Sequence, residues 1–138
     1  MVFRSRSFSG PIFPLLFITL ILLGCGDPET RFEQEMERAG LLIEQGQYDP
    51  AIEILNDLNE RFPDRGAVLF EMGRAYEGAG VGLFAALYYE QAGQADADYA
   101  DSFFTSARFY RAEGDREQAL AVVDDYLEQY PDAAEAGR

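Results

Sequence analysis

The sequence contains no histidine, no lysine and no tryptophan, and its one cysteine is Cys25. Without histidine, neither a Ser-His-Asp nor a Cys-His nucleophilic pair can be assembled. A zinc site built from cysteine and histidine would lack most of its ligands, and a single cysteine excludes an internal disulfide. These absences predict a protein that is not an enzyme and that uses no metal and no cofactor.

Basic residues are also scarce. The sequence contains 11 arginines and 25 acidic residues, which give a formal net charge of -14. A nucleic-acid partner is excluded, since phosphate neutralisation needs a basic surface. The runs Asp96-Ala97-Asp98 and Asp124-Asp125 have a spacing that could hold a divalent cation. They lack the glycine and the bidentate glutamate of a calcium loop, so helix-end capping and solvated surface are the preferred interpretation.

The first 24 residues have the parts of a secretory signal. Arg4 and Arg6 precede an uninterrupted apolar run over residues 11–23, and a positive segment followed by such a run is typical of a signal peptide. The run is shorter than the roughly 20 residues that a membrane-spanning helix needs. An uncleaved membrane anchor and an idle free cysteine remain as alternatives to processing at this point.

The segment Leu22-Leu23-Gly24-Cys25 resembles the lipobox of bacterial lipoproteins, with Leu23 where a smaller residue is more usual. The resemblance implies a signal peptide over 1–24, a lipid on Cys25 and a short tether over 25–30, so that the acyl chains hold the protein on a membrane. In that family an Asp after the cysteine often retains the protein at the inner membrane. Here Gly26 follows, so we expect the outer membrane, facing the periplasm, in a cell with two membranes.

From about residue 31 the sequence repeats every 34 residues. Small residues recur at 39, 73 and 107 and at 51, 85 and 119, and glycine recurs at 46, 80 and 114. Small residues let two helices approach closely, and a glycine with positive φ commonly ends a helix. The period resembles that of the tetratricopeptide family. A plain helical bundle is the alternative fold.

The resemblance implies an all-α fold, an α-solenoid of three tetratricopeptide helical hairpins wound as a right-handed superhelix. The repeats occupy 31–133 (about 32–65, 66–99 and 100–133), followed by a tail over 134–138. We predict helices over 31–45, 49–61, 66–78, 83–95, 100–112 and 116–129. Start signals are Thr30 with Glu33 as a capping box, Asp49 before Pro50, and Asp115 with Gln118. Glycines at 78, 80 and 82 predict a loose middle turn.

In this family the first helix of each repeat lines a concave binding face, which implies three ladders of equivalent positions. They are Met36, Phe70 and Phe104; then Gly40, Arg74 and Arg108; then Ile43, Glu77 and Arg111. Arginine and aromatic residues are typical of binding hot spots, and arginine binds carboxylates in a bidentate way. We therefore predict a groove for an extended or helical peptide with an acidic group or a free C-terminus, formed by Met36, Phe70, Arg74, Phe104, Arg108 and Arg111. The alternative is that these arginines only balance Glu71, Glu77 and Asp101.

The last repeat has no separate capping helix in the predicted pattern, which predicts exposure of Leu120, Val123, Leu127 and Tyr130. Two hypotheses of function follow. In the first, the chain is a membrane-anchored adaptor or scaffold that binds a protein partner in bacterial cell-envelope assembly. In the second, it is a structural subunit that dimerises or stacks through its uncapped C-terminal repeat.

Overall fold

The computed structural model describes residues 27–132. Within that range the chain is helical throughout and contains no strand. The predicted signal peptide, the lipidation site Cys25 and the C-terminal tail lie outside the described residues. No helix in the described range is long and apolar enough to cross a membrane. The elements are α2 (Pro28–Glu44), α3 (Tyr48–Arg61), α4 (Gly66–Gly78), α5 (Gly82–Ala95), the 3-10 turn η1 (Ala97–Tyr99), α6 (Ser102–Ala112) and α7 (Arg116–Gln129).

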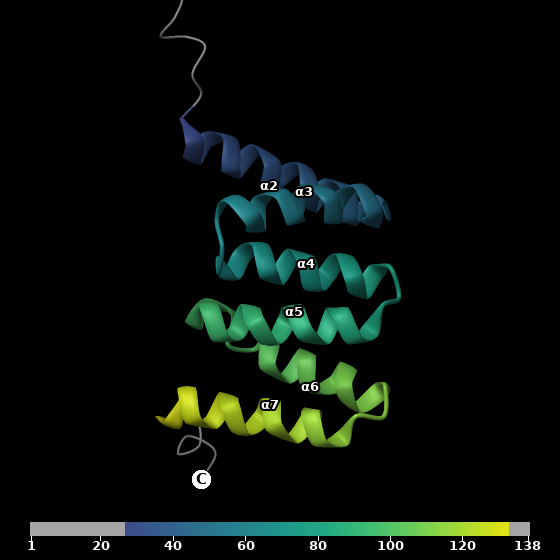
Figure 1. Ribbon diagram of the computed structural model, residues 1–138, viewed down its shortest axis with the longest axis vertical. Coiled ribbons are helices and arrows are strands. Elements are labelled where there is room, and N and C mark those ends of the chain that lie inside the picture. Colours follow the sequence, from purple (N-terminus) through teal and green to yellow (C-terminus); the bar gives the residue numbers. More distant parts are fainter. Residues whose placement is uncertain (1–26, 133–138) are drawn as a thin grey trace, which may run out of the picture. The chain divides into compact units, whose positions relative to one another are not determined.

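From Phe32 onward the helices form three antiparallel hairpins, α2–α3, α4–α5 and α6–α7, which lie one after the other in chain order (Figure 1). The first helices of successive hairpins, α4 and α6, run in the same direction. Strict repetition of a hairpin, rather than antiparallel packing alone, separates this arrangement from a plain bundle. The predicted α-solenoid of helical hairpins is confirmed.

The turn inside each hairpin has the same geometry in all three copies. Gly46, Gly80 and Gly114 have φ values of 72°, 76° and 89°, in the region where a side chain would be strained. In each turn the residue after the glycine donates its N–H to a carbonyl five residues back, at 2.8, 2.9 and 2.9 Å. This is the hydrogen bond that closes a Schellman motif, and the second helix then begins two residues after the glycine.

The structure corrects two of the three predicted helix starts. Helix α3 begins at Tyr48, so Asp49 lies in its first turn and is not its cap. Helix α2 begins at Pro28, with proline at the first helical position, so the capping box at Thr30 is wrong. The cap at Asp115 is confirmed, because its Oδ1 accepts a hydrogen bond from the backbone N–H of Gln118 at 3.0 Å.

The junction between the second and third hairpins contains the turn η1, which the sequence pattern did not predict. Asp96 caps it, since Oδ1 of Asp96 accepts from the N–H of Asp98 at 3.0 Å. This confirms helix-end capping as the role of the first aspartate in that run. Because η1 occupies the junction, α6 begins at Ser102 rather than at residue 100.

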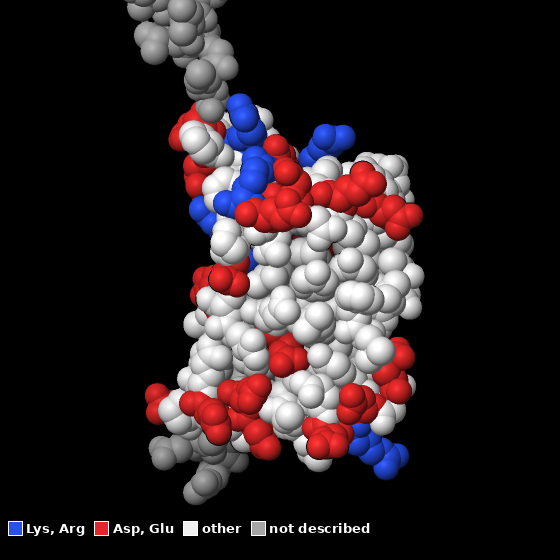
Figure 2. Space-filling model, viewed as in Figure 1, with Lys and Arg blue, Asp and Glu red and all other residues white. Residues whose placement is uncertain are grey.

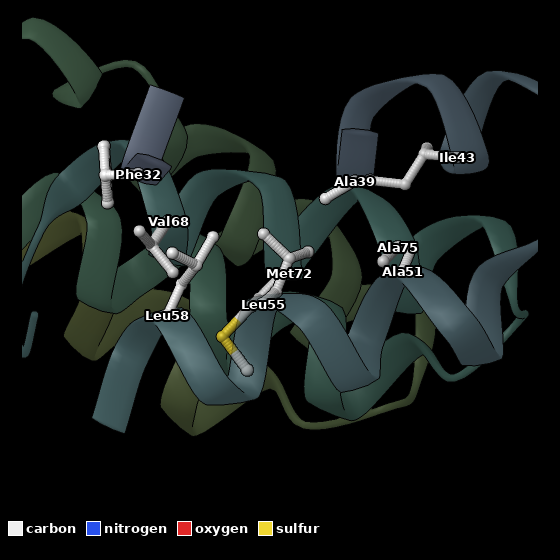
Figure 3. Packing of buried hydrophobic residues seen from close by; sticks show 9 residues of the cluster. All are labelled: Phe32, Ala39, Ile43, Ala51, Leu55, Leu58, Val68, Met72 and Ala75. Carbon is white, nitrogen blue, oxygen red and sulfur yellow. The ribbon is translucent and has the colours of Figure 1, made fainter. Parts of the chain in front are cut away.

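Small residues in register allow the close packing within and between hairpins. A Cβ built on Gly73 would lie 2.8 Å from the ring of Tyr89, so α4 and α5 pack so closely that position 73 requires glycine. Between α3 and α4, the side chains of Leu55, Leu58 and Met72 are fully buried (Figure 3). Each such side chain stabilises the fold by about 1.5–3 kcal/mol on burial.

Two glycines of the middle turn are places of close approach between neighbouring hairpins. A Cβ on Gly78 would lie 2.1 Å from the ring of Tyr48, and one on Gly82 would lie 2.3 Å from the carboxylate of Glu113. Glycine at these positions makes room for side chains of the adjacent hairpins. The looseness predicted for this turn therefore does not follow from its glycine content.

Candidate functional site

The third hairpin carries a groove of about 380 Å³ between α6 and α7. On each helix the lining residues are spaced by three, one and three positions, which places them on a single helix face. We call this groove the end groove. It is lined by Phe104, Ala107, Arg108 and Arg111 of α6 and by Arg116, Ala119, Leu120 and Val123 of α7.

The floor of the end groove is equivalent to surfaces that are covered in the first two hairpins. Ala119 corresponds in the 34-residue register to Ala51 and Ala85, which are both completely buried. Leu120 corresponds to Ile52, which is partly buried, and to Ala86, which is completely buried. Leu120 itself is 68% exposed.

In each earlier hairpin the covering element is the first helix of the next hairpin. Met72 and Ala75 of α4 belong to the same core cluster as Ala51 and Leu55, which lie in the first hairpin. Phe103 and Tyr110 of α6 share a cluster with Ala86 of the second hairpin. In the third hairpin the equivalent surface is open, since Leu120 and Phe104 are 68% and 45% exposed.

Three arginines give the end groove a positive charge in an acidic chain. None of its eight lining residues is acidic. Arg108, Arg111 and Arg116 are exposed, and within residues 27–132 none of them makes an ion pair. On the face shown in Figure 2 acidic side chains are concentrated at the two ends of the described part, and the surface over α4 and α5 carries few charges.

Arg61 and Arg65 are engaged elsewhere in the described range. Arg61 on α3 pairs with Glu35 on α2 and with Asp57 one turn earlier, and these carboxylates raise the pKa of Arg61. The guanidinium of Arg65 lies over the ring of Phe32, 4.5 Å from its centroid. Such contacts hold positive charge within the fold, whereas the arginines of the end groove point their charge at solvent.

An aromatic cluster supports the apolar end of the groove. The ring centroid of Phe104 lies 4.7 Å from that of Tyr126, and Phe103 lies 5.8 Å from Tyr126. Tyr130 extends the cluster, and its hydroxyl donates to the carbonyl oxygen of Gly93 at 3.2 Å. Phe104, which is 45% exposed, therefore projects from a packed base.

The structure brings together half of the predicted binding residues. Phe104, Arg108 and Arg111 line the end groove. Phe70 is partly buried and packs its ring against Tyr89 and Tyr99, at centroid distances of 5.5 and 5.1 Å. It therefore does not extend the groove.

Two further predicted residues also have partners inside the fold. The Nη1 atom of Arg74 donates to both carboxylate oxygens of Glu71 at 2.9 Å, which favours the alternative that Arg74 balances a nearby acid. Met36 is partly buried against the core of the first hairpins. The binding roles of Met36, Phe70 and Arg74 stay predictions.

The remaining positions of the three ladders are mostly structural. Ile43 belongs to the core, and Gly40 is partly exposed. Glu77 accepts a hydrogen bond from the hydroxyl of Tyr89 at 2.6 Å, and burial, followed by this bond, raises the pKa of Tyr89.

The half of the groove that α7 supplies was missed as a binding surface. The sequence predicted exposure of four apolar residues at this end; Leu120 and Leu127 are exposed, while Val123 and Tyr130 are partly buried. Arg116 was not singled out. Its signal was available in the spacing 116, 119, 120 and 123, which places one arginine on the same face as the apolar residues.

A second apolar surface lies on α5. Leu83, Phe84 and Leu87 are exposed by 52%, 49% and 39%. The ring of Phe84 stacks on Tyr76 at 5.1 Å between centroids, and Tyr76 stacks on Tyr88 at 5.3 Å. Exposed apolar surface of this kind is often a contact surface.

Comparison with known families gives one match. Residues 36–65 and 101–133 match the model of the tetratricopeptide repeat. The two segments correspond to the first and third hairpins, and the comparison with curated proteins gives no match. The family match and the helical hairpins together support a tetratricopeptide protein, and these repeats indicate a protein-interaction scaffold.

Proposed function

We propose that the chain is a membrane-anchored adaptor of the bacterial cell envelope that holds a partner protein in the end groove, since two of its three hairpins match the tetratricopeptide repeat. One observation carries the proposal. Leu120 is 68% exposed, although the equivalent Ala86 of the preceding hairpin is completely buried under α6. An apolar surface that the fold covers in two hairpins and leaves open in the third is suited to a partner.

The composition of the end groove fits protein recognition. Apolar residues at its floor supply the desolvation energy of binding, and arginine with an aromatic residue is the combination enriched in hot spots. The lining side chains include no carboxylate, hydroxyl or thiol. The groove therefore offers no nucleophile and no general base for catalysis.

Anchoring at Cys25 is the part of the proposal that the sequence supports. The cysteine follows directly after the apolar run, and α2 begins three positions later at Pro28. We propose that a lipid on Cys25 holds the adaptor at the outer membrane, facing the periplasm. Metabolic labelling with an alkyne fatty acid should label the wild-type protein and not Cys25→Ser. Equal labelling of both proteins would contradict the lipid site.

The adaptor role is tested by crosslinking in the native membrane. A photoreactive amino acid at position 120 should give a covalent adduct with a partner protein. The same amino acid at position 41 is the matched control, because Leu41 is also an exposed leucine, at 50%, but lies on α2. An adduct at 120 that is absent at 41 supports the proposal. Identical adduct patterns at both positions would show that the end groove has no special role.

The second candidate is a structural subunit that self-associates through the third hairpin, and the same open surface favours it. A two-fold symmetric dimer, however, would bring each groove against its own copy. Arg108, Arg111 and Arg116 would then face like charges, which opposes association. Sedimentation at several concentrations separates the candidates, because a monomer at all concentrations favours the adaptor.

A further inference from the structure

We infer that the end groove takes one amphipathic α-helix of a partner protein, which runs parallel to α6 and carries acidic residues in its C-terminal turn. The inference rests on the proposed function and specifies the chemistry of the partner. Three features of the third hairpin carry it: the shape of the groove, the position of its charges and the direction of the helices that fill its equivalents.

The shape fits a helix because helices fill the same surface twice in this chain. The surface of the first hairpin is covered by α4, with 13 residues, and that of the second by α6, with 11 residues. The two walls of the end groove repeat the spacing of a helix face, so they form two ridges with a furrow between them. A helix of about three turns, about 17 Å long, is the segment that such a furrow accepts.

Two of the three arginines of the end groove lie at one end of it, and Arg108 lies between that end and Phe104. Helices α6 and α7 are antiparallel and joined at Gly114, so Arg111 near the end of α6 and Arg116 at the start of α7 flank the turn. Phe104 lies near the other end of α6, where the later residue Val123 of α7 runs beside it. The groove is therefore most basic beside the turn and most apolar at the end of Phe104.

The direction follows from the helices that fill the equivalent surfaces. Both α4 and α6 run toward the glycine turn of their own hairpin, in the same direction (Figure 1). A partner helix in that orientation brings its C-terminus to Arg111 and Arg116. The C-terminal end of a helix carries partial negative charge and unpaired carbonyl groups, and acidic side chains there add charge-assisted hydrogen bonds to the guanidinium groups.

The test uses the full-length protein in detergent and two helix-stabilised peptides of about 14 residues. Both peptides carry leucines at alternating spacings of three and four, and they differ only in having glutamates or lysines in the last turn. Fluorescence anisotropy should show that the wild type prefers the glutamate peptide by about five- to tenfold, the effect of two or three partly exposed ion pairs. Leu120→Glu should weaken the binding of both peptides.

The decisive variant is Arg111→Glu combined with Arg116→Glu, which should reverse the preference and favour the lysine peptide. Arg31→Glu combined with Arg38→Glu is the matched control, because it makes the same change of net charge at exposed positions of α2. The control should keep the preference of the wild type. A reversal in both double variants, or no preference in the wild type, would overturn the inference.

The remaining outcomes separate this inference from the proposed function. If position 120 crosslinks to a partner while neither peptide binds, the adaptor role stands and the acidic helix is wrong. If position 120 gives no adduct and the glutamate peptide does not bind either, both are wrong. Concentration-dependent self-association that Leu120→Glu abolishes would assign the groove to a second copy of the chain and overturn the inference.

Discussion

The hydroxyl of Tyr110 on α6 donates a hydrogen bond to the carboxylate of Glu90 on α5, with 3.1 Å between the two oxygens. The bond joins the second hairpin to the third. Burial raises the pKa of Glu90 above its usual value, against the lowering effect of hydrogen bonds from Tyr110 and Gln118. Burial, together with the charge of Glu90 and this bond, raises the pKa of Tyr110 to about 12.

We predict that Glu90→Gln stabilises the protein at neutral pH. A carboxyl group whose pKa is raised by folding destabilises the folded state when it is ionised, and this penalty disappears below the pKa of the unfolded chain, near 4.3. Glutamine removes the charge and still accepts a hydrogen bond from Tyr110. The gain is small, about 2 °C in Tm, because Glu90 is only partly buried.

Thermal unfolding of both proteins at several pH values checks this sign. The difference in Tm should be largest above the raised pKa of Glu90 and should shrink as the pH falls toward the usual range of glutamate. A difference that does not change with pH would show that ionisation of Glu90 is not its cause.

Gly73→Ala should destabilise the protein by about 1–3 kcal/mol. The added Cβ would lie 2.8 Å from the ring of Tyr89, and the packing of α4 on α5 must open to admit it. Gly40→Ala is the control, because no atom lies within 4 Å of its Cβ position and it too is inside a helix. That substitution should stabilise by about 0.5–1 kcal/mol, and urea unfolding measures both.

Gly80→Ala should cost about 1–2 kcal/mol through the backbone alone. The φ of Gly80 is 76°, and its Cβ position is free of contacts within 4 Å, so only the strain of the left-handed conformation acts. Gly80→Asn should lower the free energy of unfolding less, since asparagine tolerates positive φ. Equal losses in the two variants would indicate a steric cause instead.

Arg74→Ala should leave binding of the glutamate peptide unchanged, whereas Arg108→Ala should weaken it by about threefold. Arg74 is bound to Glu71 and lies outside the end groove, and Arg108 lines the groove without an ion pair in the described range. Anisotropy titrations of the two variants compare them directly. A larger effect at Arg74 would favour the concave face that the sequence pattern predicted.

The 34-residue period predicted the hairpins because it depends on what packing requires. The small residues at 51, 73 and 85 lie where helices approach closely, and the turn glycines lie where the backbone needs positive φ. The helix starts were less predictable. Capping signals at Thr30 and Asp49 give way to the proline at position 28 and to the closing hydrogen bond of the Schellman turn.

Half of the candidate site could be predicted from the sequence. Equivalent positions on the first helices identified Phe104, Arg108 and Arg111, but the comparison of first helices alone could not include Arg116 or Leu120 on α7. The 34-residue alignment also does not show which neighbouring residue a long side chain contacts. The pairing of Arg74 with Glu71 depends on the rotamers of both residues, so it is visible only in the structure.

Because one turn and one covered surface recur every 34 residues, the chain can gain or lose length in units of one hairpin. The displacement that carries α2 to α4, and α4 to α6, defines where a further hairpin would dock, and the surface it needs is already present on α6 and α7. A duplication of residues 66–99 inserted after residue 133 keeps the register. Proteins of this design can thus lengthen or shorten during evolution in whole hairpins, without redesign of the hairpins that remain.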